Sequence, residues 1–216
     1  MFKRVLIANR GEIAIRIARA AAGLGVEQVS VHAAADAQGL HTRTSTETRA
    51  IGQPGVDPVA AYLDSEALIA VARETGCDCV HPGYGFLSEN AAFARRCLAE
   101  GLAFIGPKPE TLELFGDKVA ARELARSLDI PTVPGSPALD SAKEAAEAAD
   151  AVGYPVMLKA SAGGGGRGMR RVDAPAEMAT AFDRCASEAQ AAFGNGALFL
   201  EKLIERPRHI EVQILA

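Results

Sequence analysis

The sequence contains no apolar run of about 18 residues, the minimum for a membrane-spanning helix. The apolar stretch near the start, Val5 to Ala8, is interrupted at once by Asn9 and Arg10, so it is too short for the core of a signal peptide. With 23 Lys and Arg against 27 Asp and Glu, the chain also lacks the positive excess of nucleic-acid-binding proteins. We therefore expect neither a membrane nor a nucleic acid as its partner.

The cysteines lack the regular spacing of a disulfide framework. Cys77 and Cys79 lie close together, but no second pair follows that would complete a zinc site. This pattern favours reduced, buried cysteines in a cytoplasmic protein. The residues concerned are Cys77, Cys79, Cys97 and Cys185.

Short apolar runs alternate with helical patterns in the first half of the chain. Val5 to Ala8 is predicted to be a buried strand, and apolar residues three and four apart from Ile13 to Leu24 predict a helix that Asn9 caps. Further strands are predicted at 29–31, 77–80 and 103–105, with helices starting at Ser65 and Ser88. Strands separated by helices predict βαβ units around a parallel sheet, and we expect a Rossmann-like domain ending near Pro109.

A different pattern begins after this domain. Prolines between positions 107 and 137 flank a segment with helical spacing of apolar residues, 110–133, which we interpret as a helical connection. Ser141 and Glu144 form a capping box that starts an Ala-rich helix ending at Gly153. Strands are then predicted at 155–160, 169–172, 198–203 and 209–215, with a long helix between the second and third. The second half is therefore predicted to be a mixed α+β domain.

The stretch KASAGGGGRGMRRV, from Lys159 to Val172, places four consecutive glycines among cationic residues. Gly163, Gly165 and Gly168 fit the pattern G-x-G-x-x-G, but no helix follows to receive a pyrophosphate, and no Lys-Ser/Thr pair follows to make a P-loop. The remaining geometry is a hairpin flap, whose unsubstituted amides can close on phosphate oxygens beside Lys159. The alternative is a flexible surface hairpin with solvated arginines.

Three further features predict a cleft near this flap. Asp117 begins a predicted helix, whose free amides would favour an anion. The charged pair at 201–202 directly follows an apolar strand and suits a hinge that reads an adenine edge. On the last predicted strand, His209 shares a polar face with a carboxylate and an amide.

Several motifs follow one another along essentially the whole chain. They are VLIANRGEIAIRI (5–17), HPGYGFLSEN (81–90), FIGP, GDK (116–118), KASAGGGGRGM (159–169) and RHIEVQILA (208–216). Together they resemble the biotin carboxylase family, the ATP-grasp component of acetyl-CoA, propionyl-CoA and pyruvate carboxylases. The resemblance implies a ligase in which ATP activates bicarbonate as carboxyphosphate and the carboxyl group then passes to carrier-bound biotin.

The resemblance also implies how ATP and magnesium would be held. Two lysines, Lys118 and Lys159, would contact the ATP phosphates. The closing flap would be formed by Gly164, Gly165 and Gly166. The carboxylates that hold magnesium, and the catalytic residues themselves, would lie beyond Ala216.

The adenine and biotin sides of the site follow from the same resemblance. His209 would lie at the ribose or phosphate side, and Tyr84, in the HPGYGF turn, would lie toward the biotin pocket. Leu203 stands where the family commonly has an aromatic residue, a minor change against an adenine face. The residues lining the adenine would be Glu201, Lys202, Leu203 and Ile204, with Met169 packing on the base.

The expected fold is α/β, a Rossmann-like pre-ATP-grasp domain followed by an incomplete α+β ATP-grasp domain. The predicted parts are a pre-ATP-grasp domain (1–109), the helical connection (110–133), an ATP-grasp flap subdomain (134–207) and the first strand of a truncated catalytic sheet (208–216). The implied partners are a biotin carboxyl carrier domain and a carboxyltransferase, with a homodimer in the complete enzyme.

Two other interpretations stay open. The chain is a catalytically inactive nucleotide-binding or interaction module if the residues expected beyond Ala216 do not exist. A different ATP-grasp ligase is the third interpretation, and the HPGYGFLSEN motif argues against it. The final acceptor of the carboxyl group is not identified by the sequence, because the carboxyltransferase would lie elsewhere.

Overall fold

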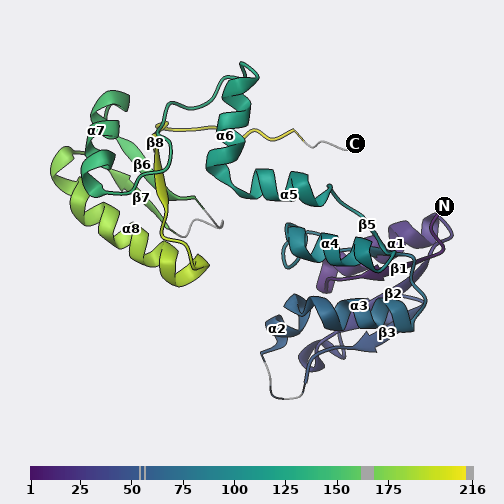
Figure 1. Cartoon of the computed structure of the whole chain (residues 1–216). Coiled ribbons are helices and arrows are strands. Elements are labelled where there is room, and N and C mark those ends of the chain that lie inside the picture. Colours follow the sequence, from purple (N-terminus) through teal and green to yellow (C-terminus); the bar gives the residue numbers. More distant parts are fainter. Residues whose placement is uncertain (54, 56, 162–167, 213–216) are drawn as a thin grey trace. The chain divides into compact units, whose positions relative to one another are not determined.

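The computed structural model describes residues 1–53, 55, 57–161 and 168–212. The chain divides into two compact units, Met1–Glu113 and Leu114–Ala216, which we call unit 1 and unit 2 and describe separately (Figure 1). Among the described residues, every helix is too short or too polar to span a membrane.

Unit 1 is built on a five-stranded parallel sheet of order β3-β2-β1-β4-β5. Its strands are β1 (Arg4–Ile7), β2 (Glu27–His32), β3 (Glu47–Ala50), β4 (Cys79–His81) and β5 (Ala103–Phe104). Its helices are α1 (Gly11–Gly23), η1 (Ala34–Asp36), η2 (Leu40–Arg43), α2 (Pro58–Leu63), α3 (Ser65–Glu74) and α4 (Ala91–Ala99). The predicted Rossmann-like parallel sheet is confirmed, with β3 as an edge strand whose polar sequence gave no strand signal.

Helices pack on both faces of the unit 1 sheet. Leu6 and Val29 face α2, α3 and α4 in one apolar core, and Val5 and Ile7 face α1 in a second. Residues 5–7 are therefore almost completely buried, as their apolar run predicts. All four cysteines are free and buried, as predicted.

Two of the predicted helix caps in unit 1 are wrong. α1 begins after Arg10, without a side-chain cap, because the Asn9 side chain bonds elsewhere. α4 is capped by Asn90 rather than Ser88, since the Asn90 side chain accepts a hydrogen bond from the Phe93 N–H.

Unit 2 contains a three-stranded antiparallel sheet of order β7-β6-β8. Its strands are β6 (Val156–Ala160), β7 (Met169–Val172) and β8 (Leu198–Lys202). α5 (Pro109–Gly116) crosses the boundary between the units, and the helices within unit 2 are α6 (Lys118–Ser127), α7 (Ala142–Val152), η3 (Pro175–Glu177) and α8 (Met178–Phe193). The predicted mixed α+β fold is confirmed, including the helical segment before the sheet.

The unit 2 sheet has two unlike faces. Leu158 and Leu200 point toward α7 and α8, which pack against the sheet and complete the core (Figure 1). The strand register puts the alternate residues on the opposite face. We call that opposite face the site face, and its members are Met157, Lys159, Met169, Arg171, Phe199 and Glu201.

The predicted strand at 209–215 is not formed over its described part. Residues 208–212 have no regular secondary structure. A strand requires a neighbour for its hydrogen bonds, and no described strand pairs with this segment. Residues 213–216 lie outside the described residues, as do Gly163, Gly164, Gly165 and Gly166 of the predicted flap.

Candidate functional site

The site face positions Lys159 through the two-residue period of β6. Lys159 lies opposite Met169 on β7 and opposite Phe199 on β8, so the three side chains share one surface. β7 and the end of β6 flank the glycine stretch, which places Lys159 and Met169 next to it in the chain. The structure thus brings together two of the residues predicted to contact ATP.

Glu201 links Lys159 to a residue that the sequence did not predict. Its Oε2 accepts a hydrogen bond from Lys159 Nζ, and its Oε1 accepts one from Arg122 Nη1 on α6. These side chains are only 28%, 15% and 12% exposed for Lys159, Glu201 and Arg122 respectively. A signal was available, because Arg122 is four residues after Lys118 and therefore lies on the same face of a helix.

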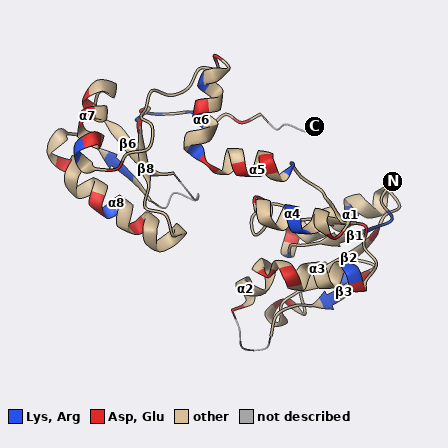
Figure 2. Ribbon diagram, in the orientation of Figure 1, with Lys and Arg blue, Asp and Glu red and all other residues tan. Residues whose placement is uncertain are grey.

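Lys118 completes a cationic cluster at the end of β6. Its Nζ donates to the Ala160 carbonyl oxygen at 3.4 Å. Burial lowers the pKa of Lys118, and repulsion from Lys159 lowers it further, while Glu201 partly opposes both effects. Within the part of the chain that the structure describes, these three cations gather around one carboxylate, Glu201, and Figure 2 shows blue residues on both β6 and α6. Such a surface is suited to an anionic group.

The start of α6 is not the open anion site that the sequence predicted. Asp117 caps this helix, and its Oδ1 accepts hydrogen bonds from the N–H groups of Val119 and Ala120 at 2.9 and 3.2 Å. A carboxylate of the chain therefore occupies the position that an external anion would need. α6 therefore contributes the side chains of Lys118 and Arg122 to the cationic cluster, and its first backbone N–H groups bind Asp117.

Residues 201–204 divide between the two faces of the sheet. Lys202 points away from Lys159, and its Nζ donates to the carbonyl oxygens of Gly153 and Tyr154 at 2.8 and 2.9 Å. The backbone N–H of Lys202 donates to Pro134, and that of Leu203 to Pro155. Ile204 is exposed, and no described residue accepts a hydrogen bond from its N–H.

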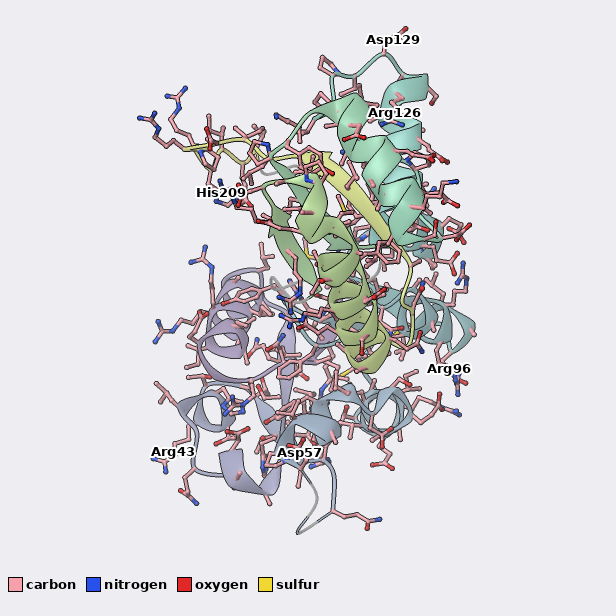
Figure 3. All side chains as sticks on the ribbon, turned by 90° about the vertical axis from the view of Figure 1, so that its left-hand side faces the viewer. Arg43, Asp57, Arg96, Arg126, Asp129 and His209 are labelled. Atoms are coloured by element: carbon pink, nitrogen blue, oxygen red, sulfur yellow. The ribbon has the colours of Figure 1, made fainter. Side chains whose placement is uncertain are left out.

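His209 is not brought to the cationic cluster. It lies on the segment after β8, and its side chain is 84% exposed (Figure 3). Its described partner is Glu211, with Nε2 and Oε1 2.9 Å apart. Arg170 differs from the solvated surface alternative, because it is one-third exposed and pairs with Glu188 of α8, whereas Arg171 is half exposed and pairs with Asp173.

Tyr84 lies in unit 1, in the turn that follows β4. The buried Asn9 side chain donates to the carbonyl oxygens of Pro82 and Tyr84 at 2.7 and 2.9 Å, which fixes the turn. Gly83 has φ +69°, and a Cβ there would lie 2.8 Å from Asn9 Nδ2, so the turn favours glycine. This holding role of Asn9 was missed because the residue also fits a helix cap.

The exposed Tyr84 hydroxyl donates to Glu12 Oε1 at 2.7 Å, and this bond raises the pKa of Tyr84. Beside it an apolar cavity of about 610 Å³ is lined by residues of α1, β1 and β4, including Ile13, Ile17 and Cys79. The sequence placed Tyr84 at a substrate pocket, and the structure places it at the rim of this cavity.

Magnesium is the second group that the sequence resemblance implies. Among the described residues, no three His, Cys, Asp or Glu side chains gather closely enough to hold a metal ion. The carboxylate nearest the lysines, Glu201, is already paired with two cations. The described residues therefore do not form a magnesium site.

Comparison with known proteins agrees with this geometry. Residues 1–112 match the family described as "Biotin carboxylase, N-terminal domain", and residues 117–216 match "Carbamoyl-phosphate synthase L chain, ATP binding domain". A biotin carboxylase from Nostoc sp. is 50% identical over 100% of this chain and 48% of its own length. A pyruvate carboxylase from Bacillus subtilis is 51% identical over 99% of this chain and 19% of its own length.

Two solved structures match closely. A Campylobacter jejuni biotin carboxylase, described as a β-γ-ATP complex, has a TM-score of 0.93 and 41% identity over 96% of this chain and 46% of its own. The biotin carboxylase domain dimer of Hydrogenobacter thermophilus 2-oxoglutarate carboxylase, in complex with MgADP, ADP and bicarbonate, has a TM-score of 0.91 and 45% identity over 95% and 45% of the two chains. The chain thus spans about half the length of these biotin carboxylases. Since a family match covers more than half of its residues, the chain belongs to the biotin carboxylase family.

Proposed function

We propose that unit 2 binds ATP and that the chain takes part in the ATP-dependent carboxylation of biotin with bicarbonate. The observation that carries the proposal is the positive cluster of Lys118, Lys159 and Arg122 around a single carboxylate, on a sheet face that adjoins a glycine stretch. The phosphate oxygens of ATP can accept charge-assisted hydrogen bonds from such cations. Glycine amides supply donors that no side chain obstructs.

The proposed reaction forms carboxyphosphate. An oxygen of bicarbonate attacks the γ-phosphorus of ATP, the bond between that phosphorus and the β–γ bridging oxygen breaks, and ADP leaves with the electron pair. Lys118 and Lys159 stabilise the negative charge on the phosphate oxygens, which is the main protein contribution to phosphoryl transfer. A ureido nitrogen of biotin then bonds the carboxyl carbon of carboxyphosphate, the bond from that carbon to the phosphate oxygen breaks, and the departing phosphate takes the proton that the nitrogen loses.

The other predicted site residues are assigned to parts of the ligands by their positions in the chain. Gly164, Gly165 and Gly166 close on the nucleotide, Met169 packs on the base, and the exposed backbone of Ile204 reads the adenine edge. Tyr84 serves the biotin side of the reaction. His209 reaches the ribose or phosphates only after its segment moves from the exposed position seen here.

The proposed partners are those of a biotin-dependent carboxylase: a biotin carboxyl carrier domain, a carboxyltransferase and a second copy of the chain, all in the cytoplasm. Support comes from the relatives, which include multi-domain pyruvate carboxylases and a biotin carboxylase domain dimer. Magnesium, present in the Hydrogenobacter complex, is proposed as the metal that accompanies ATP. We propose no single acceptor, because the relatives carry names with different acceptors.

The proposal is tested by ATP titration of the full-length protein without bicarbonate. Lys159→Met should weaken ATP binding by about 1.5–3 kcal/mol, because it removes a charge-assisted hydrogen bond to phosphate. The matched control is Arg170→Met, on the helix-covered face, where it pairs with Glu188. Its effect on ATP affinity should stay below about 0.5 kcal/mol. Equal losses in the two variants would contradict the site. Binding without bicarbonate-dependent ADP release would favour the nucleotide-binding module instead.

A further inference from the structure

Arg122 is held by its two terminal nitrogens, while its buried Nε has no hydrogen-bond partner among the described residues. Its Nη1 donates to Glu201 Oε1, and its Nη2 donates to the Val133 carbonyl oxygen at 2.6 Å. The guanidinium carbon also lies 6.0 Å from the centre of the Phe199 ring. Only 12% of the side chain is exposed, so it has little freedom to turn toward a ligand.

The backbone at Gly135 passes close to the Arg122 guanidinium. A Cβ on Gly135 would lie 2.9 Å from Arg122 Nη2 and 2.4 Å from the Leu200 carbonyl oxygen. The absence of a side chain at 135 therefore lets the chain pass close to the guanidinium. A planar group with two donors fits between Glu201 and Val133, whereas a lysine ammonium would reach only one of them.

Arg122 changes how strongly Glu201 holds Lys159. The two oxygens of the Glu201 carboxylate are divided, one to Arg122 and one to Lys159. If Arg122 were neutral, both oxygens and the whole negative charge would act on Lys159. Lys159 would then have to leave a stronger ion pair before it could contact a phosphate.

We propose that Arg122 is a positioning residue of the nucleotide site, which holds Glu201 so that Lys159 is released to the phosphates. The inference rests on the proposed function, because it requires that Lys159 binds phosphate. Arg122 itself stays on Glu201 and Val133 and acts on the nucleotide only through Lys159. Its effect is therefore specific to the phosphate part of the ligand.

The test compares ADP with adenosine in the full-length protein. Arg122→Met should raise the Kd for ADP about tenfold and leave the Kd for adenosine within about twofold, because adenosine has no phosphate. Arg126→Met is the matched control, since Arg126 lies one turn later on α6 and donates to the Gly135 carbonyl oxygen at 3.2 Å, without contacting Glu201 (Figure 3). Its ADP affinity should be unchanged, and unchanged adenosine binding shows that each variant is folded.

A second pair of variants tests the route through Glu201. In a Glu201→Gln background the loss caused by Arg122→Met should shrink to about twofold or less, because no carboxylate remains to hold Lys159. Arg122→Lys should recover part of the ADP affinity by restoring one charge on Glu201. An equal loss in both backgrounds, or an equal loss for ADP and adenosine, would overturn the inference alone. If the unaltered protein binds neither ligand, the proposed function falls and the inference falls with it.

Discussion

The two sheets of this chain differ in how completely their two faces are covered. The central strand of unit 1, β1, is apolar over residues 5–7 and is buried from both sides. The central strand of unit 2, β6, alternates buried residues with half-buried ones, and Lys159 is one of the latter. A lysine in the middle of β1 would lose its hydration in an apolar core, whereas on β6 it keeps one open side. The site face, which α6 covers only in part, is therefore where the phosphate-binding charge can be placed.

Unit 1 instead carries its polar groups where strands end. Asn9 follows β1 and fixes the turn after β4 through two carbonyl oxygens. Asp36 follows β2, accepts a hydrogen bond from Tyr62 at 2.7 Å and pairs with Arg10. This is the usual location of ligand sites in parallel sheets. The comparison teaches that the strand pattern determines whether functional residues lie along a strand or beyond its end.

The largest effect is expected from Gly135→Ala, which should destabilise unit 2 by about 3 kcal/mol. The new Cβ would lie 2.4 Å from the carbonyl oxygen of Leu200. This oxygen belongs to the backbone of β8, so it cannot move aside as the end of a flexible side chain could. Hydrogen exchange should increase in β6 and β8. Exchange in β1 and β4 should stay unchanged if the two sheets are stabilised separately.

Gly83→Ala should destabilise unit 1 instead of unit 2, because the new Cβ would clash with the side chains of Ile13 and Asn9. Exchange should then increase in β1 and β4 only. Gly23→Ala is the neutral control, because nothing lies within 4 Å of a Cβ at that position. If either clashing variant loosened both sheets equally, the two units would have to be treated as one cooperative structure.

The next effect separates the two faces of the unit 2 sheet. Lys202→Met should lower stability by about 1.5 kcal/mol, because Nζ donates to two carbonyl oxygens at the end of α7. It should leave ATP affinity unchanged, since the side chain points away from Lys159. Lys159→Met should instead lower ATP affinity and leave stability nearly unchanged. Thermal melting measures the stability of both variants, and ATP titration measures their affinity. A loss of ATP affinity in Lys202→Met would show that the side chain reaches the nucleotide after all.

Much of the fold could be predicted because local patterns agree with the tertiary structure. The apolar run at 5–8 is typical of a strand buried on both faces of its sheet. The alternation at 156–160 is typical of a strand that is fully buried on one face only. β3 was missed because an edge strand makes few apolar contacts and its sequence is polar. The strand at 209–215 was predicted from alternation alone, yet a strand also needs a neighbour that no pattern within it reveals.

The site was predicted less completely, since its contacts join distant segments. Lys118 and Lys159 were predicted through motifs, but the carboxylate that holds Lys159 also pairs with Arg122, and Glu201 and Arg122 are 79 positions apart. Lys202 was assigned to the adenine together with Glu201, although neighbouring residues of a strand point to opposite faces. The strand period therefore separates the two side chains, while the place of Lys202 at the adenine stays a prediction.

The smallest expected effect is a loss of stability of unit 1 at acidic pH. His41 is 2% exposed, and burial lowers its pKa, while Asp36 opposes the shift and His32 and Arg10 add to it. The pKa of the imidazole is thus lower in the folded unit than in the unfolded chain, where it lies near 6.5. The unfolded state binds the extra proton first, so His41 disfavours folding as the pH falls below about 6.5.

Hydrogen exchange of β1 and β2, followed from pH 7.5 to 5.5 and corrected for the intrinsic rate, should show unit 1 losing stability in acid. His41→Gln should reduce that loss, whatever its effect at neutral pH, because glutamine does not titrate. A smaller acid loss should remain, since burial also lowers the pKa of His81 in the same unit. His209→Gln is the control, because its exposed side chain lies in unit 2. An acid loss as large in His41→Gln as in the unaltered chain would show that Asp36 stabilises the imidazolium enough to cancel the burial of His41.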